Sequence, residues 1–209
     1  MQNSFPYLDI LIFGVIAIFL IFRLKNILGT KTGFEENNIN EKSGNEKYTN
    51  VVTLKPKVDD LENIELNKIL KVDPNFDLVD FLSGSKTFFE MVLKGFVDGN
   101  LENIKNFTKA SVLQSFKTAI NDRNKEQETL IIDLKSIQKN EITSSKISRT
   151  AIKINVIFES TQVRALLDKN GTIIDGDREN EILVKDEWIF ERKIKENNPN
   201  WTLVETKSY

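Results

Sequence analysis

Asp186 is the residue that the sequence places best for chemistry. In a strand-like run it alternates with Val184, Trp188 and Phe190, so the four side chains share one face of the predicted strand. A carboxylate removed from water on that face would have a raised pKa and could act as a general base. An active site of this kind would suit an isomerase that acts on an apolar substrate.

A proton-transfer partner for Asp186 is missing from the sequence. The 209 residues include no histidine and no cysteine, which excludes Ser-His-Asp and Cys-His catalysis, histidine- or thiolate-bound zinc and disulfides. The tyrosines are Tyr7, Tyr48 and Tyr209, and none is expected to line the interior. We therefore predict no catalytic residue, metal or cofactor, and expect Asp186 to lie at a bend or to pair with an arginine or lysine. The enzyme stays as an alternative.

Two acidic segments have the composition of calcium-binding loops. They are Asp168-Lys169-Asn170-Gly171 and Asp175-Gly176-Asp177-Arg178-Glu179. Neither has the glycine at the sixth loop position or the glutamate at the twelfth that such loops use. Asn-Gly and Asp-Gly pairs favour tight turns between strands. We predict hairpin turns at both places.

The large aromatic residues are candidates for either the core or a pocket. The set consists of Phe88, Phe89, Phe96, Phe116, Phe158, Trp188 and Phe190, with Asp186 on the strand face of the last two. Aromatic side chains at helix and strand spacing are first of all core residues. The alternative is an apolar pocket for a lipid chain or an apolar peptide segment.

The charge balance opposes nucleic-acid binding. The whole chain has a formal net charge of −2. Residues 32–209 hold 26 basic and 30 acidic side chains, whereas a nucleic-acid-binding domain needs a basic face. We therefore expect no nucleic-acid partner.

An apolar run near the N-terminus predicts a membrane anchor. Its large apolar residues are Ile10, Leu11, Ile12, Phe13, Val15, Ile16, Ile18, Phe19, Leu20, Ile21 and Phe22. A helix of about 20 residues here would be about 30 Å long, which matches the bilayer core. Arg23 and Lys25 follow the run and no basic residue precedes it, the reverse of a cleaved signal. The positive-inside rule then places the N-terminus outside and the body in the cytoplasm. The alternative is a buried core helix.

The rest of the chain divides into a tether and a domain. We assign residues 1–29 to the anchor, 30–76 to a flexible tether and 77–209 to the domain. Residues 30–57 are polar and lack the apolar side chains that order a segment. Residues 58–70 have the pattern of a short amphipathic helix. Because this helix carries four acidic side chains, anionic lipid would repel it, and we expect it to dock on the domain or on a partner.

Helical periodicity comes first in the domain and strand periodicity follows it. We predict a helix from Asp77, its N-cap, to Asp98-Gly99, a short helix near 101–107 and a third helix over 109–123. Alternating apolar residues then predict strands around 130–134, 152–158, 182–190 and 201–204. This order is typical of the α+β class, with helices packed on one face of a strongly curved antiparallel sheet.

Several short fragments carry a family resemblance. Near the anchor they are Phe22-Arg23-Leu24, Leu28-Gly29 and Gly33; in the domain they are Asp73-Pro74-x-Phe76-Asp77, Asp98-Gly99-Asn100, Asp122-Arg123, Trp188-x-Phe190-x-Arg192 and Asn200-Trp201-x-Leu203-Val204. In this order they resemble the bacterial TimA-type proteins and the Tim-forty-four-like domain of the mitochondrial inner-membrane translocase. The resemblance covers nearly the whole chain.

The resemblance implies a fold, a location and a role. The fold would be a nuclear-transport-factor-two-like cone around an apolar pocket. The role would be that of a membrane-anchored, non-enzymatic scaffold for protein translocation or membrane-protein handling. The expected partners are membrane lipid and a translocase, chaperone or membrane-protein client. A ribosome is the alternative partner, because a mitochondrial large-ribosomal-subunit protein has a related domain. The membrane span favours the bacterial branch and a single-pass protein of the bacterial inner membrane.

Overall fold

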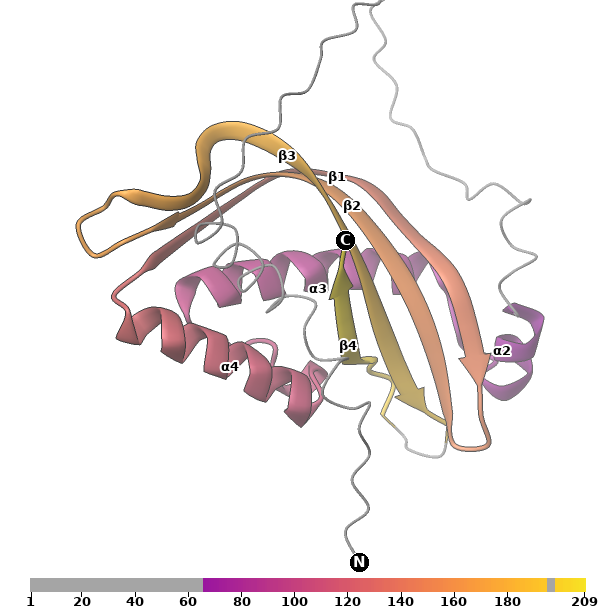
Figure 1. Ribbon diagram of the computed structural model, residues 1–209. Helices are drawn as coiled ribbons and strands as arrows, with labels where there is room; N and C mark the ends of the chain where they lie inside the picture. The colour runs from indigo at the N-terminus through magenta and orange to yellow at the C-terminus, as the bar shows by residue number, and fades with distance from the viewer. Residues whose placement is uncertain (1–65, 195–197) are drawn as a thin grey trace, which may run out of the picture.

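Helices precede strands along the part of the chain that can be described. The computed structural model describes residues 66–194 and 198–209. Its elements are α2 (Leu66–Val72), α3 (Leu78–Asp98), the 3-10 helix η2 (Lys105–Phe107), α4 (Ala110–Lys125), β1 (Thr129–Ile147), β2 (Ala151–Leu167), β3 (Ile173–Lys193) and β4 (Thr202–Ser208). The strands form an antiparallel sheet in the order β1-β2-β3-β4, and the helices lie beneath its concave face (Figure 1). The predicted α+β class is confirmed.

The predicted bounds of the long helix are confirmed by its caps. The Asp77 carboxylate accepts hydrogen bonds from the backbone N–H groups of Val79 and Asp80, at 2.8 and 2.9 Å. These bonds satisfy two of the donors that a helix N-terminus leaves free. At the other end Gly99 adopts a left-handed φ of 71° and its N–H bonds back to the Gly95 carbonyl. This conformation ends α3 at the residue where the Asp-Gly pair predicts a stop.

Arg123 joins the end of α4 to the end of α3. Its Nη2 donates to the carbonyls of Phe96 and Val97, at 2.8 and 3.1 Å. Its guanidinium also lies over the Phe96 ring, 5.3 Å from the centroid. A cation on the last carbonyls of a helix favours both their hydrogen bonding and the helix dipole. The side chain is buried, so this contact fixes how the two helices cross.

Register shifts bend the edge strand around the helices. The pairing of β1 with β2 shifts at three places, which are Leu134/Ser136, Ile137/Lys139 and Ile142/Ser144. At each place β1 has one residue more than β2, and an extra residue bends and twists a strand. In Figure 1 the strands arch over α3 and α4. Bulges and edge lysines such as Lys135 also discourage a further strand from pairing with β1.

One of the two predicted hairpin turns is wrong. The Asn170-Gly171 turn is confirmed: it joins β2 to β3, and the Asp168 carboxylate accepts the N–H groups of Asn170 and Thr172 at 2.8 Å. Asp175-Gly176 instead lies inside β3 at a bulge opposite Ala165. Gly176 has a φ of 74°, and a Cβ there would lie 2.2 Å from the Arg164 carbonyl oxygen. An Asp-Gly pair favours left-handed backbone, and a bulge uses this conformation as readily as a turn.

The aromatic core lies between α3 and the concave face of β2 and β3. Phe89 stacks on Phe158 with 4.5 Å between ring centroids and 18° between planes. The Trp188 ring lies 4.8 Å from Phe89 and 5.4 Å from Phe158. All three side chains are buried. Helix and sheet therefore meet through a three-ring cluster.

The packed part of the chain begins before Asp77, inside the predicted tether. Ile69 of α2 is fully buried and Phe76 is 7 % exposed, and both belong to the hydrophobic core. Asp73 also forms an ion pair with Arg192 of β3. The short amphipathic helix thus docks on the domain, as expected, although its first part lies outside the described residues. The sequence pattern did not reveal that Ile69 and Phe76 belong to the core, because both lie in a segment with many polar residues.

The predicted membrane anchor, residues 1–29, also lies outside the described residues, as do residues 30–65 of the predicted tether. Of the described helices, none has the length and apolar character needed to cross a membrane.

Trp188→Ala is expected to destabilise the fold severely. The side chain is 1 % exposed, and truncating a buried aromatic residue costs about 3–5 kcal/mol. At this domain size such a loss lowers the melting temperature by roughly 10 °C or more. The measurement is thermal unfolding of the full-length protein in mild detergent. Leu183→Ala, on the same strand but 66 % exposed, is the control and should melt within about 2 °C of the wild type. A small effect at Trp188 would contradict its place in the core.

Candidate binding groove

An apolar groove opens between α3 and the segment that leads into β4. Its volume is about 400 Å³. It is lined by Asp80, Phe81, Ser83, Gly84, Ser85, Thr87, Phe88, Met91, Phe107, Phe190, Pro199, Asn200 and Trp201. Aromatic rings and a methionine form the walls, while short polar side chains stand at the rim. This composition is typical of a site for an apolar ligand whose ends stay in water.

Helical spacing creates the α3 side of the groove. Phe81, Gly84, Ser85 and Phe88 are separated by three or four positions and so lie on one face of the helix. Gly84 has no side chain, and the space beside it is open: a Cβ added there would meet no atom within 4 Å. The floor of the groove therefore has room for part of a ligand.

A chain of contacts holds the opposite wall in place. The Trp201 ring lies 4.9 Å from that of Phe81 and 5.9 Å from that of Phe76. The guanidinium of Arg192 lies 4.9 Å from the centroid of the Trp201 ring. The same guanidinium also pairs with the Asp73 carboxylate. A cation over an indole face is attracted by the ring quadrupole. The wall is therefore fixed to α2 as well as to β3.

Sequence reasoning missed Arg192, Asp73 and Trp201 as parts of this site. A signal was present, because Arg192 follows Trp188 and Phe190 at the alternate positions of β3 that face inward. Strand periodicity could thus have placed Arg192 beside the aromatic residues. Nothing in the sequence indicates that Asp73, from another element, supplies its counter-charge.

The candidate aromatic residues fall into three places. Phe88 and Phe190 line the groove, with 6.2 Å between their ring centroids. Phe89, Phe158 and Trp188 form the core cluster beneath it. The last two, Phe96 and Phe116, pair with each other at 5.8 Å near Arg123, away from the groove.

Asp186 is buried and held by two neighbours. It is 4 % exposed, and the hydroxyl of Ser208 on β4 donates a hydrogen bond to its Oδ1. Arg164 is the nearby positive charge, and its Nε donates to the side-chain amide oxygen (Oε1) of Gln162 at 2.8 Å. Burial raises the pKa of the Asp186 carboxyl, while the Ser208 bond and the charge of Arg164 act in the opposite direction. The predicted arginine neighbour is present, and Ser208 is a partner that the sequence did not reveal.

The arrangement around Asp186 offers no proton-transfer chain to Tyr209. The Tyr209 hydroxyl donates to Glu187 at 3.0 Å, and Glu187 lies on the opposite strand face from Asp186. In residues 66–194 and 198–209, no group of three or more carboxylates is placed to hold a metal ion. The carboxylates of Asp168 and Asp177, from the two calcium-like segments, accept the backbone N–H groups of Asn170 and Glu179, two residues further along the chain.

These features define an α+β domain in which a long antiparallel sheet covers its helices and an aromatic groove opens beside the longest of them. The sequence model of the Tim44-like domain matches residues 64–208. The chain therefore belongs to the Tim44-like domain family.

This chain corresponds to only part of the length of its translocase relative. The probable mitochondrial import inner membrane translocase subunit tin-44 of Caenorhabditis elegans is 24 % identical over 147 residues. That match covers 67 % of this chain and 34 % of the relative, so the chain matches about a third of the relative's length. Among solved structures, the intermembrane space region of the chloroplast protein ARC6 is similar with a TM-score of 0.45 and 11 % identity, over 65 % of this chain and 98 % of that one.

Asp186→Asn is expected to stabilise the domain near neutral pH. A raised pKa means that the folded state binds the proton more tightly than the unfolded state. The contribution of the Asp186 carboxyl to the free energy of unfolding is then greatest at low pH, and it is lost as the pH rises through the folded-state pKa. Asparagine keeps an acceptor for Ser208 but cannot ionise, so its advantage should be present at pH 7.5 and shrink at pH 4. Urea unfolding at the two pH values measures the difference.

The matched control for Asp186 is Asp133→Asn, an exposed carboxylate paired with Lys135 at 2.7 Å. This variant should change stability little at either pH. If Asp186→Asn is less stable than the wild type at pH 7.5, the ionised carboxylate stabilises the fold through Arg164, and the burial argument is wrong.

Proposed function

We propose that this protein is a membrane-anchored, non-enzymatic scaffold that binds protein clients during protein translocation or membrane-protein handling at a bacterial inner membrane. The observation that carries the proposal is the family match over residues 64–208, which includes all the described strands. The worm relative, a probable mitochondrial import inner membrane translocase subunit, supplies the link to an inner-membrane translocase. The apolar run at residues 10–22 supplies the link to a membrane.

The groove is the proposed binding surface for an apolar segment of a client. Half-buried Phe88, Met91 and Trp201 present apolar surface that a ligand would remove from water. Burying such surface stabilises a complex by about 25 cal/mol per Å². The rim residues Asp80 and Asn200 stay exposed and would meet the polar ends of the segment. A lipid chain is the competing occupant with the same apolar chemistry.

The geometry around Asp186 supports the non-enzymatic part of the proposal. A general base needs both a path to substrate and a group that stabilises the developing charge. Asp186 instead accepts from Ser208 and faces Arg164 within the packed interior. The cone form of the relatives is a further part of the proposal, and it is supported by the long strands and the bulges of β1.

The proposed topology places the domain on the cytoplasmic side, with the N-terminus outside. Arg23 and Lys25 follow the apolar run, so translocating the domain would oppose the positive-inside rule. Protease added to the periplasmic face of spheroplasts should leave the domain intact, while protease added to inverted vesicles should digest it. Digestion from the periplasmic side, or recovery of the full-length protein in a salt-washed soluble fraction, would contradict the anchor.

Client binding is tested by photocrosslinking from the groove. A photoreactive residue at Thr87, on the groove rim, should crosslink to a peptide that carries an apolar membrane segment. The same residue at Lys94, two turns further along α3 and exposed, is the control and should capture little. The full-length protein is reconstituted in lipid nanodiscs, and a photoreactive fatty acid is offered in a separate arm.

A substitution that fills the groove separates binding there from binding elsewhere. Gly84→Phe places a ring in the open space above Gly84 and should reduce peptide capture about tenfold, the loss that corresponds to ~1.4 kcal/mol of binding. Lys86→Phe adds the same ring to an exposed position outside the groove and should leave capture unchanged. Capture of the fatty acid alone would assign the groove to lipid, and equal capture from Thr87 and Lys94 would refute a binding groove.

A further inference from the structure

One edge of β3 is unpaired over part of its length. β4 accompanies β3 only from Asp186 to Glu191, so the end of β4 lies beside the middle of β3 (Figure 1). The last bond on this side joins the Tyr209 N–H to the Lys185 carbonyl at 3.0 Å. Over residues 181–184, β3 has β2 on one side and no described strand on the other. An edge of this kind presents free backbone N–H and C=O groups to a further strand.

The open backbone groups belong to Glu181 and Leu183. The pairing of β3 with β2 runs without a shift from Lys193 to Glu181, so this part of β3 is regular. In a regular antiparallel strand, the N–H and C=O of one residue point to the same edge, and successive residues alternate between the two edges. The Lys185 carbonyl points to the β4 side, so Leu183 and Glu181 turn their N–H and C=O groups to that side as well.

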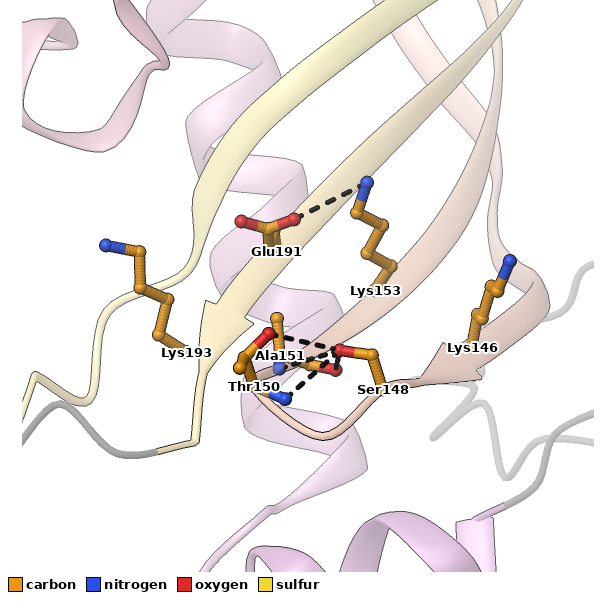
Figure 2. Close-up of a pocket in the computed structure, with 7 residues that line it drawn as sticks. All are labelled: Lys146, Ser148, Thr150, Ala151, Lys153, Glu191 and Lys193. Carbon is orange, nitrogen blue, oxygen red and sulfur yellow. Dashed lines mark hydrogen bonds and ion pairs between the residues drawn. The ribbon is translucent and has the colours of Figure 1, made fainter.

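The far end of β3 contrasts with this stretch. There Glu191 pairs with Thr202 of β4, and its carboxylate lies 3.5 Å from the Lys153 ammonium (Figure 2). The adjacent β1–β2 turn is closed by the Ser148 hydroxyl, which donates to the Ala151 carbonyl at 3.0 Å and accepts its N–H at 2.9 Å. The bonds at that end stay within the domain, whereas the stretch before Lys185 offers its bonds to a partner.

Apolar side chains accompany the open edge. Leu183, on the outer face of the sheet, is 66 % exposed, and Ile182, on the face that it shares with Val184, is 43 % exposed. Glu181 and Lys185 stand on either side of this pair. Unpaired backbone groups combined with exposed apolar side chains suit recognition by strand addition, in which a further strand extends the sheet.

Two copies of this edge could pair antiparallel in three registers centred on this stretch. With Glu181 opposite Glu181, like charges meet, and Leu183 faces Glu179, whose N–H is already bonded to a side chain at 2.7 Å. With Leu183 opposite Leu183, Glu181 faces Lys185, whose carbonyl already accepts the Tyr209 N–H. With Glu181 opposite Leu183, the open N–H and C=O groups of both copies are all used.

We propose that two copies of this chain join their sheets through this edge, with Glu181 of each copy opposite Leu183 of the other. Ile182 then faces Ile182 of the second copy across the two-fold axis. Glu181 lies diagonal to Lys185 of the second copy, within reach of a long side chain. Lys185 pairs only loosely with Glu159 in its own chain, at 3.9 Å, so it can meet a second carboxylate. A second copy thus supplies the hydrogen bonds, the apolar contact and the opposite charge. The inference does not depend on the proposed translocation role.

Disulfide trapping is the suitable measurement, because stable interfaces have about 20–30 residues a side and this contact has about five. The chain has no cysteine of its own, and Ile182→Cys introduces one on the two-fold axis. Residues that face each other in a non-hydrogen-bonded pair have Cα atoms about 4.5 Å apart, which is within disulfide range. The full-length protein is oxidised in vesicles of phosphatidylcholine.

Two single-cysteine variants are the controls. Ile173→Cys has the same exposure as Ile182, 43 %, but lies at the start of β3, away from the contact. Leu183→Cys is more exposed, but its counterpart lies diagonally at about 7–8 Å. We expect Ile182→Cys to form the disulfide-linked dimer about tenfold faster than either control, since it alone meets the disulfide geometry. Random collision would instead favour Leu183→Cys, so equal rates, or a faster rate at Leu183, would overturn the proposal.

Two further substitutions in the Ile182→Cys protein test the strand pairing itself. Leu183→Pro removes an N–H on the open edge and keeps the pairing with β2, so it should lower the rate to that of Ile173→Cys. Leu183→Ala keeps this N–H and should retain most of the rate. Glu181→Lys leaves the backbone intact and sets a second cation near Lys185. It should slow trapping in low salt but not in 1 M salt, where charges are screened beyond about 3 Å. No effect of Leu183→Pro in a folded variant, or of Glu181→Lys in low salt, would overturn the pairing.

An extended segment of another protein is the competing occupant of this edge. A synthetic peptide of residues 178–186, RENEILVKD, should slow the trapping of Ile182→Cys. A peptide of the same composition in scrambled order should leave the rate unchanged. Equal slowing by the two peptides would assign the edge to extended peptides in general and overturn the self-contact.

Discussion

The contact between α3 and the inner face of β2 and β3 is the constraint on which the rest of the structure depends. Phe89, Phe158 and Trp188 meet there and are withdrawn from water. Burial of three large aromatic side chains supplies much of the stability that a domain of this size has in reserve. Phe88 directly precedes Phe89 on α3, so the contact of the three rings also holds Phe88 beside Phe190. The groove opens along the helix face that carries Phe88.

Charged residues then position the parts that the aromatic contact leaves free. Arg123 binds the last carbonyls of α3 and so fixes α4. Arg192 lies over Trp201 and pairs with Asp73, and so ties α2, β3 and the approach to β4 together. An exposed ion pair contributes little, but a cation held between an aromatic face and a carboxylate orders both neighbours. Arg192 therefore contributes both to the groove wall and to the docking of α2, which Ile69 also anchors in the core.

Buried and exposed charged side chains have different consequences in this domain. Asp186 is buried beside Arg164 and Ser208, where its charge is costly and serves the packing of β4. Lys153 instead lies on the outer face of the sheet, where its ammonium is 3.5 Å from the Glu191 carboxylate. A buried charge thus affects the stability of the fold, whereas an exposed charge affects the interactions of the protein with other molecules.

The sequence alone determined the order and type of the elements, because periodicity, caps and turn residues are local signals. Asp77 and Gly99 mark both ends of α3, and alternation marks a part of each strand, although β1, β2 and β3 extend well beyond the predicted runs. Alternation likewise placed Asp186 inside, though not its bond to Ser208. Only the tertiary structure decided the groove, the Asp73–Arg192 pair and the bulge at Gly176. The place of Arg192 and the bulge depend on how β3 pairs with β2, and a shift of one residue in this register would turn Arg192 to the other face of the sheet. Local periodicity carries no information on register between distant segments, so folding itself had to bring these residues together.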